Sequence, residues 1–433
     1  MKKIILLLLL SALLAGCRNR NTKQLVMTAA DILGNPAYPA MSYGGYRAAT
    51  RDTVPTVEDI KEDMRLLAAM NIKLIRTYDT GGGQMPNLLK AIKELQKEDP
   101  DFEMYLMLGA WIQCKNAQTD SVCHAEEDLA GNTAEIERAV QIARDYPEIV
   151  KCIAVGNECM VHWAASYYVS PKVILHWVEY LQQKKADGEL PASLWITCSD
   201  NFASWGGGSE EYHTDDLKAL INAVDFLSIH TYPFHDSYYN PEYWTVPEAE
   251  RTLSPAEQAD RAVNRAVEYA VGQYRQVLAY LDELEVNKPV HIGETGWATQ
   301  DGPSKRESQS SDISLASFLV TDDLSMYGIG GTGAADEYKA KAYYDGLCEW
   351  CSRNRVTCFY FEAFDEPWKD KYNAQGSENH FGLMEGNLAK YVLWDLVDQG
   401  AFESLTRGGK PIGKTFDGDV KALKESILPI RGK

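Results

Sequence analysis

The sequence is dominated by a repeated alternation of short apolar runs with amphipathic helical patterns, which extends from about residue 40 to residue 370. The apolar runs are rich in β-branched and aromatic residues, which is typical of strands. They fall at residues 40–47, 73–79, 103–112, 150–158, 194–202, 225–233, 289–297 and 357–365. Residues 104–108 are apolar at every position, as expected for a strand that is buried on both faces.

The helical patterns between these runs favour a closed barrel. Ser254-Pro255-Ala256-Glu257, for example, has the capping-box pattern with proline at the first helical position. Strands that alternate with helices are typical of α/β folds, and the absence of a G-x-G-x-x-G turn after the first strand disfavours a doubly wound sheet. The sequence therefore predicts a single (β/α)₈ TIM barrel.

The expected domain limits follow from the same pattern. We expect the barrel to span residues 36–400, with a last helix at 388–397 and a C-terminal tail, 401–433, that packs on the barrel. The connection 298–333 is the longest and is expected to be a loop at the barrel rim. No linker rich in Pro, Ser or Gly and no internal repeat divides the chain.

The N-terminus has the pattern of a bacterial lipoprotein signal. Lys2 and Lys3 precede an uncharged stretch that ends Leu13-Leu14-Ala15-Gly16-Cys17 and is too short to span a bilayer as a mature helix. We predict a signal peptide at 1–16, a lipidated Cys17 and a polar spacer that extends to residue 35. An ordinary secretory signal is the alternative. The expected location is extracytoplasmic, anchored to a bacterial membrane, with the outer membrane favoured and either its periplasmic or its cell-surface face open.

The charge of the chain narrows the class of partner. It has 62 acidic and 43 basic residues, a net charge of −19, whereas phosphate backbones require a basic surface. Nucleic acids and polyanionic polysaccharides are therefore disfavoured, and neutral polymers and small molecules remain. We expect a monomer that binds a neutral polysaccharide or oligosaccharide.

Cysteine and histidine spacing gives no metal-site pattern. Cys114 and Cys123 flank a polar loop and form the most favoured disulfide. Cys348 and Cys351 form a C-x-x-C inside a helical pattern, with no second cysteine pair at zinc-finger spacing. The histidines include no H-E-x-x-H motif. We therefore expect no metal ion and no cofactor.

Two glutamates lie where a barrel enzyme places its catalytic groups. Glu158 ends the fourth predicted strand and Glu294 lies near the end of the seventh, each after an apolar run and a glycine. Carboxyl ends of barrel strands open onto the active-site loops. Two carboxyls about 5–5.5 Å apart suit retaining glycoside hydrolysis. Asn157 could hydrogen-bond a sugar hydroxyl beside Glu158, or could be a turn residue.

These residues resemble a known family. Asn157-Glu158 with Glu294 at the two strand ends is the pattern of clan A glycoside hydrolases. Gly293-Glu294-Thr295-Gly296-Trp297 and the segment 360–369 are similar to motifs of glycoside hydrolase family 17, which comprises β-1,3-glucan endohydrolases and β-glucan transglycosylases. The resemblance covers roughly residues 36–390 and departs at Cys159 and Ala298. It implies Glu158 as the acid/base and Glu294 as the nucleophile.

Several further residues are candidates for substrate binding. The nucleophile must stay ionised, and the Tyr232 hydroxyl could support it. The resemblance suggests that Glu362 and Lys369 support the donor-side sugar, with structural salt bridges as the alternative. Tyr43, Arg76 and Tyr78 could bind or position the same sugar, or Arg76 could orient a catalytic glutamate. Sugar rings stack on flat aromatic side chains; the tryptophans at predicted strand ends or in the following loops are Trp111, Trp163, Trp205, Trp244, Trp297 and Trp368, with Trp297 favoured.

The sequence thus predicts a lipid-anchored, retaining glycoside hydrolase that cleaves β-glucan, most simply β-1,3-linked laminarin-type glucan. Three alternatives remain open. The same residues could transfer the glycosyl group to another sugar, the substrate could be another neutral glycan such as mannan, xylan or β-1,6-glucan, or the barrel could bind glycans without catalysis.

Overall fold

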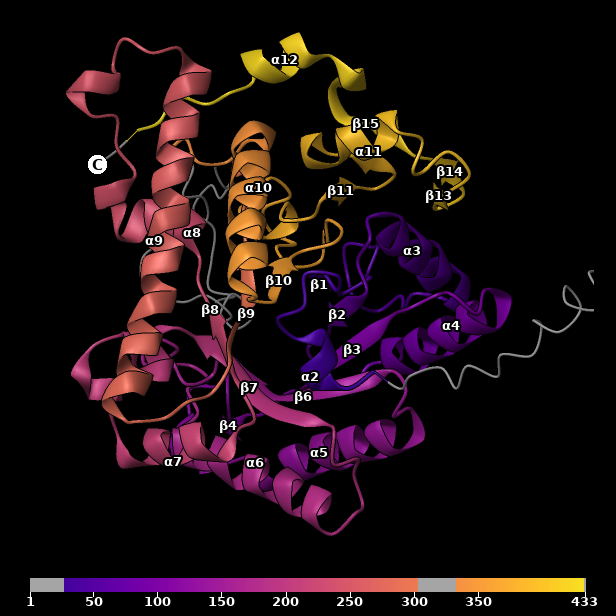
Figure 1. The fold of residues 1–433 in the computed structure, drawn as a ribbon, viewed down its shortest axis with the longest axis vertical. Helices are drawn as coiled ribbons and strands as arrows, with labels where there is room; N and C mark the ends of the chain where they lie inside the picture. The colour runs from indigo at the N-terminus through magenta and orange to yellow at the C-terminus, as the bar shows by residue number, and fades with distance from the viewer. Residues whose placement is uncertain (1–26, 303–331, 432–433) are drawn as a thin grey trace, which may run out of the picture.

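The computed structural model describes residues 27–302 and 332–431 and contains a closed barrel of parallel strands (Figure 1). The order around the barrel is β1-β10-β9-β8-β7-β6-β3-β2. The strands are β1 (Ala40–Ser42), β2 (Leu74–Arg76), β3 (Tyr105–Ala110), β6 (Val150–Asn157), β7 (Trp195–Asn201), β8 (Leu227–His230), β9 (Val290–Gly296) and β10 (Cys358–Phe361). Each lies inside a predicted apolar run, so the predicted (β/α)₈ barrel is confirmed.

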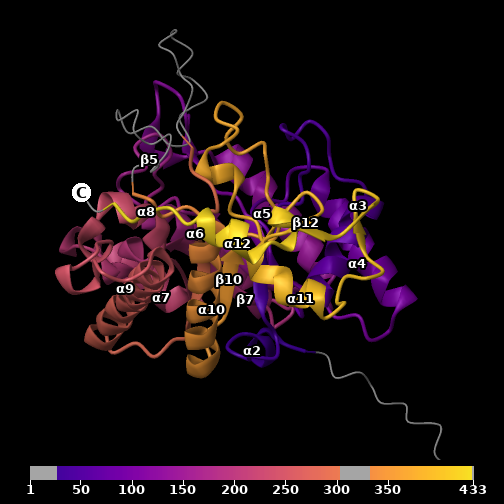
Figure 2. The same cartoon turned by 90° about the horizontal axis from the view of Figure 1, so that it is seen from above.

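Helices surround the barrel in both views (Figures 1 and 2). Those between the barrel strands are α3 (Val57–Ala69), α4 (Gln84–Glu98), α5 (Leu129–Asp145), α6 (Pro171–Ala186), α7 (Asp215–Ala223), α8 (Pro233–Tyr239), α9 (Pro255–Glu283) and α10 (Glu337–Asn354). Short turns of helix are η1 (Ala203–Gly207), η2 (Glu210–Tyr212), η3 (Pro241–Tyr243), η4 (Glu248–Glu250), η7 (Ser377–Asn379), η8 (Tyr391–Leu393) and η9 (Thr415–Gly418). The Ser254–Glu257 capping box forms as predicted and starts α9.

The N-terminal end of the barrel is closed by α2 (Ala29–Ile32). The side chains of Ala29 and Ile32 are completely buried. They share a hydrophobic cluster with residues at or near the strand starts, namely Ala40, Leu74, Tyr105, Met107, Cys152, Ala154, Phe226 and Phe359. The Gly34 backbone N–H also donates to Thr357 Oγ1 at 2.8 Å. Residues 27–35 are therefore part of the fold rather than of a polar spacer, because their apolar side chains fill the barrel floor.

The C-terminal region follows β10, where a regular (β/α)₈ barrel would have its last helix. It contains β11 (Met384–Glu385), β12 (Leu388–Ala389), α11 (Trp394–Asp398), β13 (Thr406–Arg407), β14 (Lys410–Pro411), β15 (Gly413–Lys414) and α12 (Val420–Glu425). The predicted helix at 388–397 is wrong in its first half, because Leu388 and Ala389 pair with β11 and β15. Figures 1 and 2 show α12 beside α10, and β13 contacts α3.

A buried ion pair fixes this region to the barrel. Arg407 Nε lies 2.9 Å from Asp63 Oδ1, and the Asp63 side chain is fully buried. Arg47 Nη2 lies 2.7 Å from the same oxygen. A single carboxylate on α3 therefore holds a cation from the loop after β1 and another from β13.

A hairpin follows β3 that the sequence did not predict, formed by β4 (Cys114–Lys115) and β5 (Cys123–Glu127). The expected disulfide is not formed, since Cys114 and Cys123 are both free. Cys114 Sγ instead lies 3.8 Å from His124 Nδ1. Most of the predicted rim loop 298–333 lies outside the described residues.

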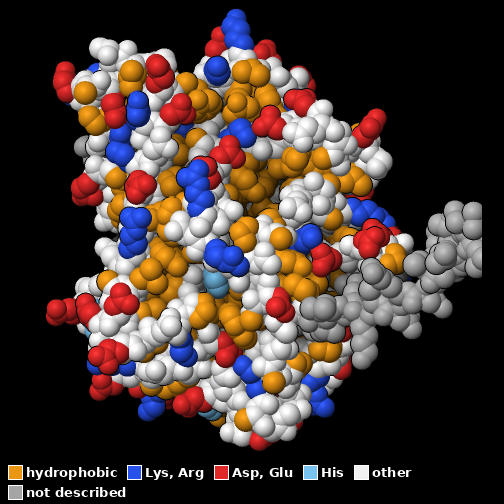
Figure 3. All heavy atoms as spheres, in the orientation of Figure 1, with side chains coloured by type: hydrophobic (Ala, Val, Ile, Leu, Met, Phe, Trp, Pro, Cys, Tyr) orange, Lys and Arg blue, Asp and Glu red, His pale blue; other side chains and the backbone are white. Residues whose placement is uncertain are grey.

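Figure 3 shows acidic and basic side chains interspersed on one face of the molecule. Within residues 27–302 and 332–431, no helix is both long and apolar enough to cross a bilayer.

Replacing the α2 plug residue, Ile32→Ala, is expected to lower the free energy of unfolding by about 2–5 kcal/mol, as for other large-to-small changes in a closed core. Urea denaturation followed by tryptophan fluorescence measures the change. Ala30→Ser, on the exposed side of the same helix, is the matched control and should change stability by less than about 0.5 kcal/mol. Equal stability of the two variants would show that α2 is not part of the folded unit.

Candidate active site

The end of β6 is shaped to present Glu158 at the barrel mouth. Gly156 has a φ of +80° and Glu158 has a φ of +46°, so the backbone turns sharply there. A Cβ at Gly156 would lie 2.8 Å from Cys159 Sγ, which explains the glycine. Glu294, by contrast, lies within β9, one residue after Gly293.

The structure brings the two glutamates together. One carboxylate oxygen of Glu158, one of Glu294 and a ring nitrogen of His230 all lie within 4.8 Å of one another. The strands β6 and β9 are separated in the barrel by β7 and β8, so the side chains reach toward each other over the mouth. Such a separation fits the closer of the two carboxylate spacings found in glycoside hydrolases.

Glu294 is buried and held by three donors. Arg76 Nη1 lies 2.8 Å from Oε2, the Tyr78 hydroxyl donates to Oε2 at 3.0 Å, and the Tyr232 hydroxyl donates to Oε1 at 2.7 Å. Burial alone raises the pKa of Glu294, but His230, Arg76 and the two hydroxyls together outweigh it, so the pKa lies below its ordinary value. Glu294 is therefore an ionised carboxylate, as a nucleophile requires.

Arg76 also links the two strand ends that carry the glutamates. Its Nη1 donates to the Gly293 carbonyl oxygen at 2.7 Å, and its Nη2 donates to Asn157 Oδ1. Of the two sequence alternatives for Arg76, orientation of a catalytic glutamate fits this geometry. The side-chain amide oxygen of Asn157 therefore accepts a hydrogen bond from the same guanidinium group that contacts Glu294.

Glu158 has a different environment. Its side chain is 26% exposed, and Oε1 lies 2.9 Å from Nδ1 of the fully buried His230. His230 Nε2 lies 2.8 Å from Ser199 Oγ, which lies 2.8 Å from Ser228 Oγ. A polar chain therefore runs from Glu158 into the barrel interior. It fixes the imidazole beside a carboxyl that faces solvent.

Gly293 makes room for this chain. A Cβ at Gly293 would lie 2.0 Å from Ser228 Oγ and 2.5 Å from Ser199 Oγ. His230 was not identified from the sequence. The available signal was its place, two residues before Tyr232, at the end of the strand next to that of Glu294.

A charged cluster follows β10. Lys369 Nζ lies 2.7 Å from Glu362 Oε2, 3.2 Å from Glu366 Oε2 and 3.9 Å from the centre of the Phe361 ring. Burial raises the pKa of Glu362 well above its usual range, an effect that Lys369 opposes and Glu366 reinforces. The Lys369 ammonium group thus lies between two buried carboxyl groups just after β10.

Glu378, on η7, is a functional candidate that the sequence did not reveal. Its pKa is raised to about 7, mainly by burial; Glu158 and Glu294 contribute to the rise and Lys369 opposes it. Its Oε1 lies 3.9 Å from Nε2 of His235, whose ring lies 5.2 Å from that of Tyr232, so a third carboxyl lies near the residues that support Glu294. It lies in a long loop without periodicity, so only its position in space singles it out.

Two predicted substrate-binding residues are buried and donate hydrogen bonds to groups other than Glu158 and Glu294. Tyr43 is 1% exposed, and its hydroxyl donates to Asp63 Oδ2 at 3.1 Å. Trp297 is 1% exposed, and its Nε1 donates to the Ala334 carbonyl oxygen. The expected sugar contacts of these residues do not fit this placement, because each serves the packing behind the strand ends.

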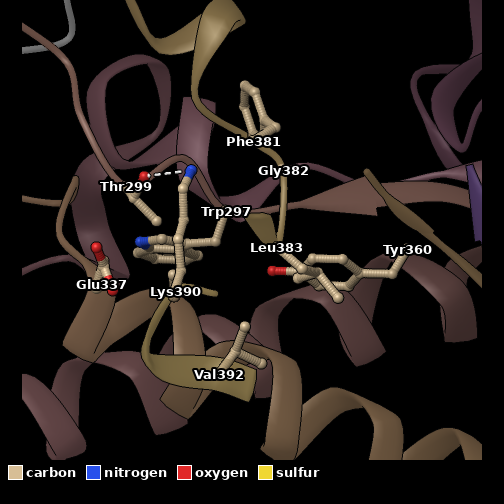
Figure 4. A pocket seen from close by; sticks show the side chains of 10 residues that line it. Trp297, Thr299, Glu337, Tyr360, Phe381, Gly382, Leu383, Lys390 and Val392 are labelled. Atoms are coloured by element: carbon tan, nitrogen blue, oxygen red, sulfur yellow. Dashed lines mark hydrogen bonds between the residues drawn. The ribbon is translucent and has the colours of Figure 1, made fainter. Parts of the chain in front are cut away.

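Figure 4 shows Trp297 beside Thr299 and Lys390 in a small interior cavity. Its volume is about 10 Å³, enough for roughly one water molecule and far too small for a sugar. Trp205 and Trp244 are also fully buried. Trp368 is partly buried, and the Arg51 guanidinium lies 5.1 Å from its ring.

The ligand atoms of Glu158, His230 and Glu294 lie close enough together to hold a cation. However, both Glu294 oxygens already accept hydrogen bonds, and Arg76 places a permanent positive charge beside Oε2. A metal ion would have to sit next to that guanidinium. The donor set suits acid–base and nucleophilic chemistry better than metal ligation.

Solved structures place this arrangement among known folds. A crystal structure of an endo-laminarinase from Formosa Hel1_33_131 is 52% identical, with a TM-score of 0.86 over 94% of this chain and 99% of that chain. A glycoside hydrolase family 17 β-1,3-glucanosyltransferase from Rhizomucor miehei is 18% identical, with a TM-score of 0.51 over 87% and 98% of the two chains. The second likeness shows a shared fold.

Sequence relatives agree with the solved structures. A probable glucan endo-1,3-beta-glucosidase, btgC, of Aspergillus flavus is 23% identical over 367 residues, which are 82% of this chain but 43% of that protein. The chain thus spans less than half the length of this relative. A glucan 1,3-beta-glucosidase of Schizosaccharomyces pombe is 25% identical over 79% of this chain and 82% of its own. The profile of the BtgE/BtgC glycoside hydrolase domain matches residues 40–382, and the chain therefore belongs to that family.

Proposed function

We propose that the protein is a retaining endo-β-1,3-glucanase that acts on laminarin-type glucan, with Glu294 as nucleophile and Glu158 as acid/base. The observation that carries the proposal is the pair itself: an ionised Glu294, held by Arg76, within 4.8 Å of a partly exposed Glu158. The 52% identity to an endo-laminarinase supports the choice of substrate. The net charge of −19 does not repel a neutral glucan.

In the first step, a carboxylate oxygen of Glu294 attacks the anomeric carbon of the donor sugar. Glu158 gives its proton to the glycosidic oxygen as the bond from that oxygen to the anomeric carbon breaks. The leaving sugar departs with a new hydroxyl group, and an ester joins the donor sugar to Glu294. Arg76, Tyr78 and Tyr232 hold Glu294 in place before the attack.

In the second step, Glu158 is a carboxylate and acts as the base. It takes a proton from a water molecule whose oxygen attacks the anomeric carbon, and the ester bond to Glu294 breaks. Two inversions leave the configuration unchanged. His230 contacts Glu158 Oε1 and keeps the carboxyl in place through both roles. A sugar hydroxyl in place of water would give transglycosylation by the same residues.

We also propose that the mature protein is a monomer anchored to a bacterial membrane, with the outer membrane favoured, through lipid on Cys17. The support is the sequence pattern alone: Lys2 and Lys3, an uncharged stretch, and small residues directly before the cysteine. Residues 1–26 lie outside the described part of the structure. A lipid anchor would hold the barrel near glucan fragments at the membrane surface.

The wild-type protein is expected to release reducing ends from laminarin, and NMR should show the β-anomer as the first product. Glu294→Ala should abolish this activity, and Glu158→Gln should lower it by roughly 10²–10⁴-fold, the usual contribution of a general acid. Glu283→Gln, an exposed glutamate on α9, is the matched control and should retain full activity.

Three outcomes of the same assay would contradict parts of the proposal. A first-formed α-anomer would exclude retention. Products longer than the supplied laminari-oligosaccharides would identify a transglycosylase. Release of reducing ends from mannan or xylan, but not from laminarin, would show that the substrate is a different neutral glycan.

The pH profile of activity tests whether the Tyr232 hydroxyl group lowers the pKa of Glu294. Its carboxylate form must be present, so activity is lost as the pH falls through the pKa of Glu294. Tyr232→Phe removes a hydrogen bond that lowers this pKa, so the acid limb of kcat/KM should move to higher pH. Activity should fall by roughly 10- to 150-fold, since a hydrogen bond to a charged group contributes about 1.5–3 kcal/mol.

Tyr274→Phe is the control for this change. It removes a buried hydroxyl that donates to the Val290 carbonyl oxygen, at the opposite end of β9. Its acid limb should coincide with that of the wild type. An unmoved acid limb in Tyr232→Phe would show that Tyr232 does not set the charge of the nucleophile.

Full-length protein expressed in a Gram-negative host should incorporate radiolabelled fatty acid and sediment with membranes. Cys17→Ser should do neither, because the lipidated thiol is absent. Cys123→Ser, which removes a free cysteine inside the folded region, should behave as the wild type does. Unlabelled wild-type protein in the soluble fraction would exclude the anchor.

A further inference from the structure

The loop after Glu158 carries an unusual tryptophan. Trp163 is 53% exposed, and it is the one tryptophan that is mainly exposed among residues 27–302 and 332–431. Trp205, Trp244 and Trp297, which also follow barrel strands, are at most 1% exposed. The fold therefore buries three indoles near the strand ends and leaves one in solvent, five residues after the proposed acid.

The backbone that carries Trp163 is braced. The loop closes on itself where the Val169 N–H donates to the Cys159 carbonyl oxygen at 2.7 Å. The Met160 N–H donates to Asp200 Oδ2 at 2.8 Å. Such anchoring fixes the base of the loop on the rim formed by β6 and β7.

The residue next to Trp163 is fixed as well. The His162 N–H donates to the Tyr212 hydroxyl oxygen at 3.1 Å, and the two rings stack with centroids 4.1 Å apart and an interplanar angle of 15°. Trp163 therefore stands on a held loop rather than on a free one. A rigid position lowers the entropy cost of binding a ligand there.

The two sides of the reacting bond can be assigned to different strands. Glu294, on β9, attacks the donor sugar, and its supports come from β2, from the residues just after β2 and from those just after β8. The buried Glu362–Lys369 pair follows β10. Glu158 protonates the oxygen on the leaving side and belongs to β6, which lies opposite β10 in the barrel. The leaving sugar is therefore expected on the side of the loop that follows β6.

From this arrangement we propose that Trp163 forms the binding platform for the sugar on the leaving side of the scissile bond. The indole would stack on the apolar C–H face of a glucosyl residue, which needs no charge and suits a neutral glucan. The same platform would receive the acceptor sugar if the enzyme transfers glycosyl groups. This inference rests on the proposed function and adds a residue that sets substrate length and acceptor use.

A platform on the leaving side has a distinctive kinetic effect. It stabilises substrates that place a sugar there and has no effect on donors whose leaving group is a single atom. β-Laminaribiosyl fluoride is such a donor, because fluoride occupies almost no space beyond the bond that breaks. The two substrates therefore separate binding on the leaving side from chemistry at Glu294.

The test compares Trp163→Ala with the wild type on laminaripentaose and on β-laminaribiosyl fluoride. For laminaripentaose, kcat/KM should fall by roughly 5- to 30-fold, the scale expected for loss of one aromatic stack with its buried area. The rate of fluoride release should stay within about twofold of the wild-type rate, because this step needs only Glu294 and the donor side. Trp163→Phe should restore most of the laminaripentaose activity, because it keeps a flat apolar face.

Phe416→Ala is the matched control, since it removes a 38% exposed aromatic ring from η9 in the C-terminal region. It should leave both rates unchanged. An equal fall of both rates in Trp163→Ala would show a structural role and overturn the proposal, as would an unchanged rate on laminaripentaose. Failure of the wild type itself on both substrates would instead refute the proposed function.

Discussion

The contact between Arg76 and Glu294 joins two strands across the barrel, and the geometry of the mouth depends on it. Both side chains are almost completely buried, at 1% and 7% exposure. A buried carboxylate without a partner would take up a proton, whereas a guanidinium does not lose its own. Each charge is therefore tolerated because of the other. The same arginine reaches Asn157, so one side chain sets the position of the strand ends that carry both glutamates.

The two glutamates differ because their surroundings differ. Glu294 is enclosed by a cation and two hydroxyl groups, which keep it ionised. Glu158 faces solvent on one side and the imidazole of His230 on the other. Gly293 lets Ser199 and Ser228 sit behind that imidazole, since any larger residue would overlap both hydroxyls. The glycine beside Glu294 therefore helps to hold Glu158 on another strand. Such division of roles between two carboxyls by environment is general in glycoside hydrolases.

The rest of the molecule keeps this mouth rigid. Helix α2 fills the floor of the barrel, and the C-terminal region covers the flank between α3 and α10, where Arg407 meets Asp63. Three tryptophans that follow barrel strands pack inside and stabilise the strand ends. The indole that remains exposed, Trp163, stands on a loop braced by Tyr212. Tryptophans near the strand ends therefore have two roles: those that are buried support the strands, and the exposed one offers a contact surface.

The sequence by itself determined the barrel and indicated the proposed catalytic pair, because both correspond to local patterns. The strands lie in short apolar runs, and Glu158 and Glu294 each come within two residues after a glycine at or near the end of such a run. The tertiary structure decided which side chains meet them. Arg76 and Glu294 are 218 positions apart, and His230 and Glu158 are 72 apart. No local periodicity encodes such contacts. Burial is equally non-local, so only the folded chain distinguishes Trp297 in the core from Trp163 in solvent.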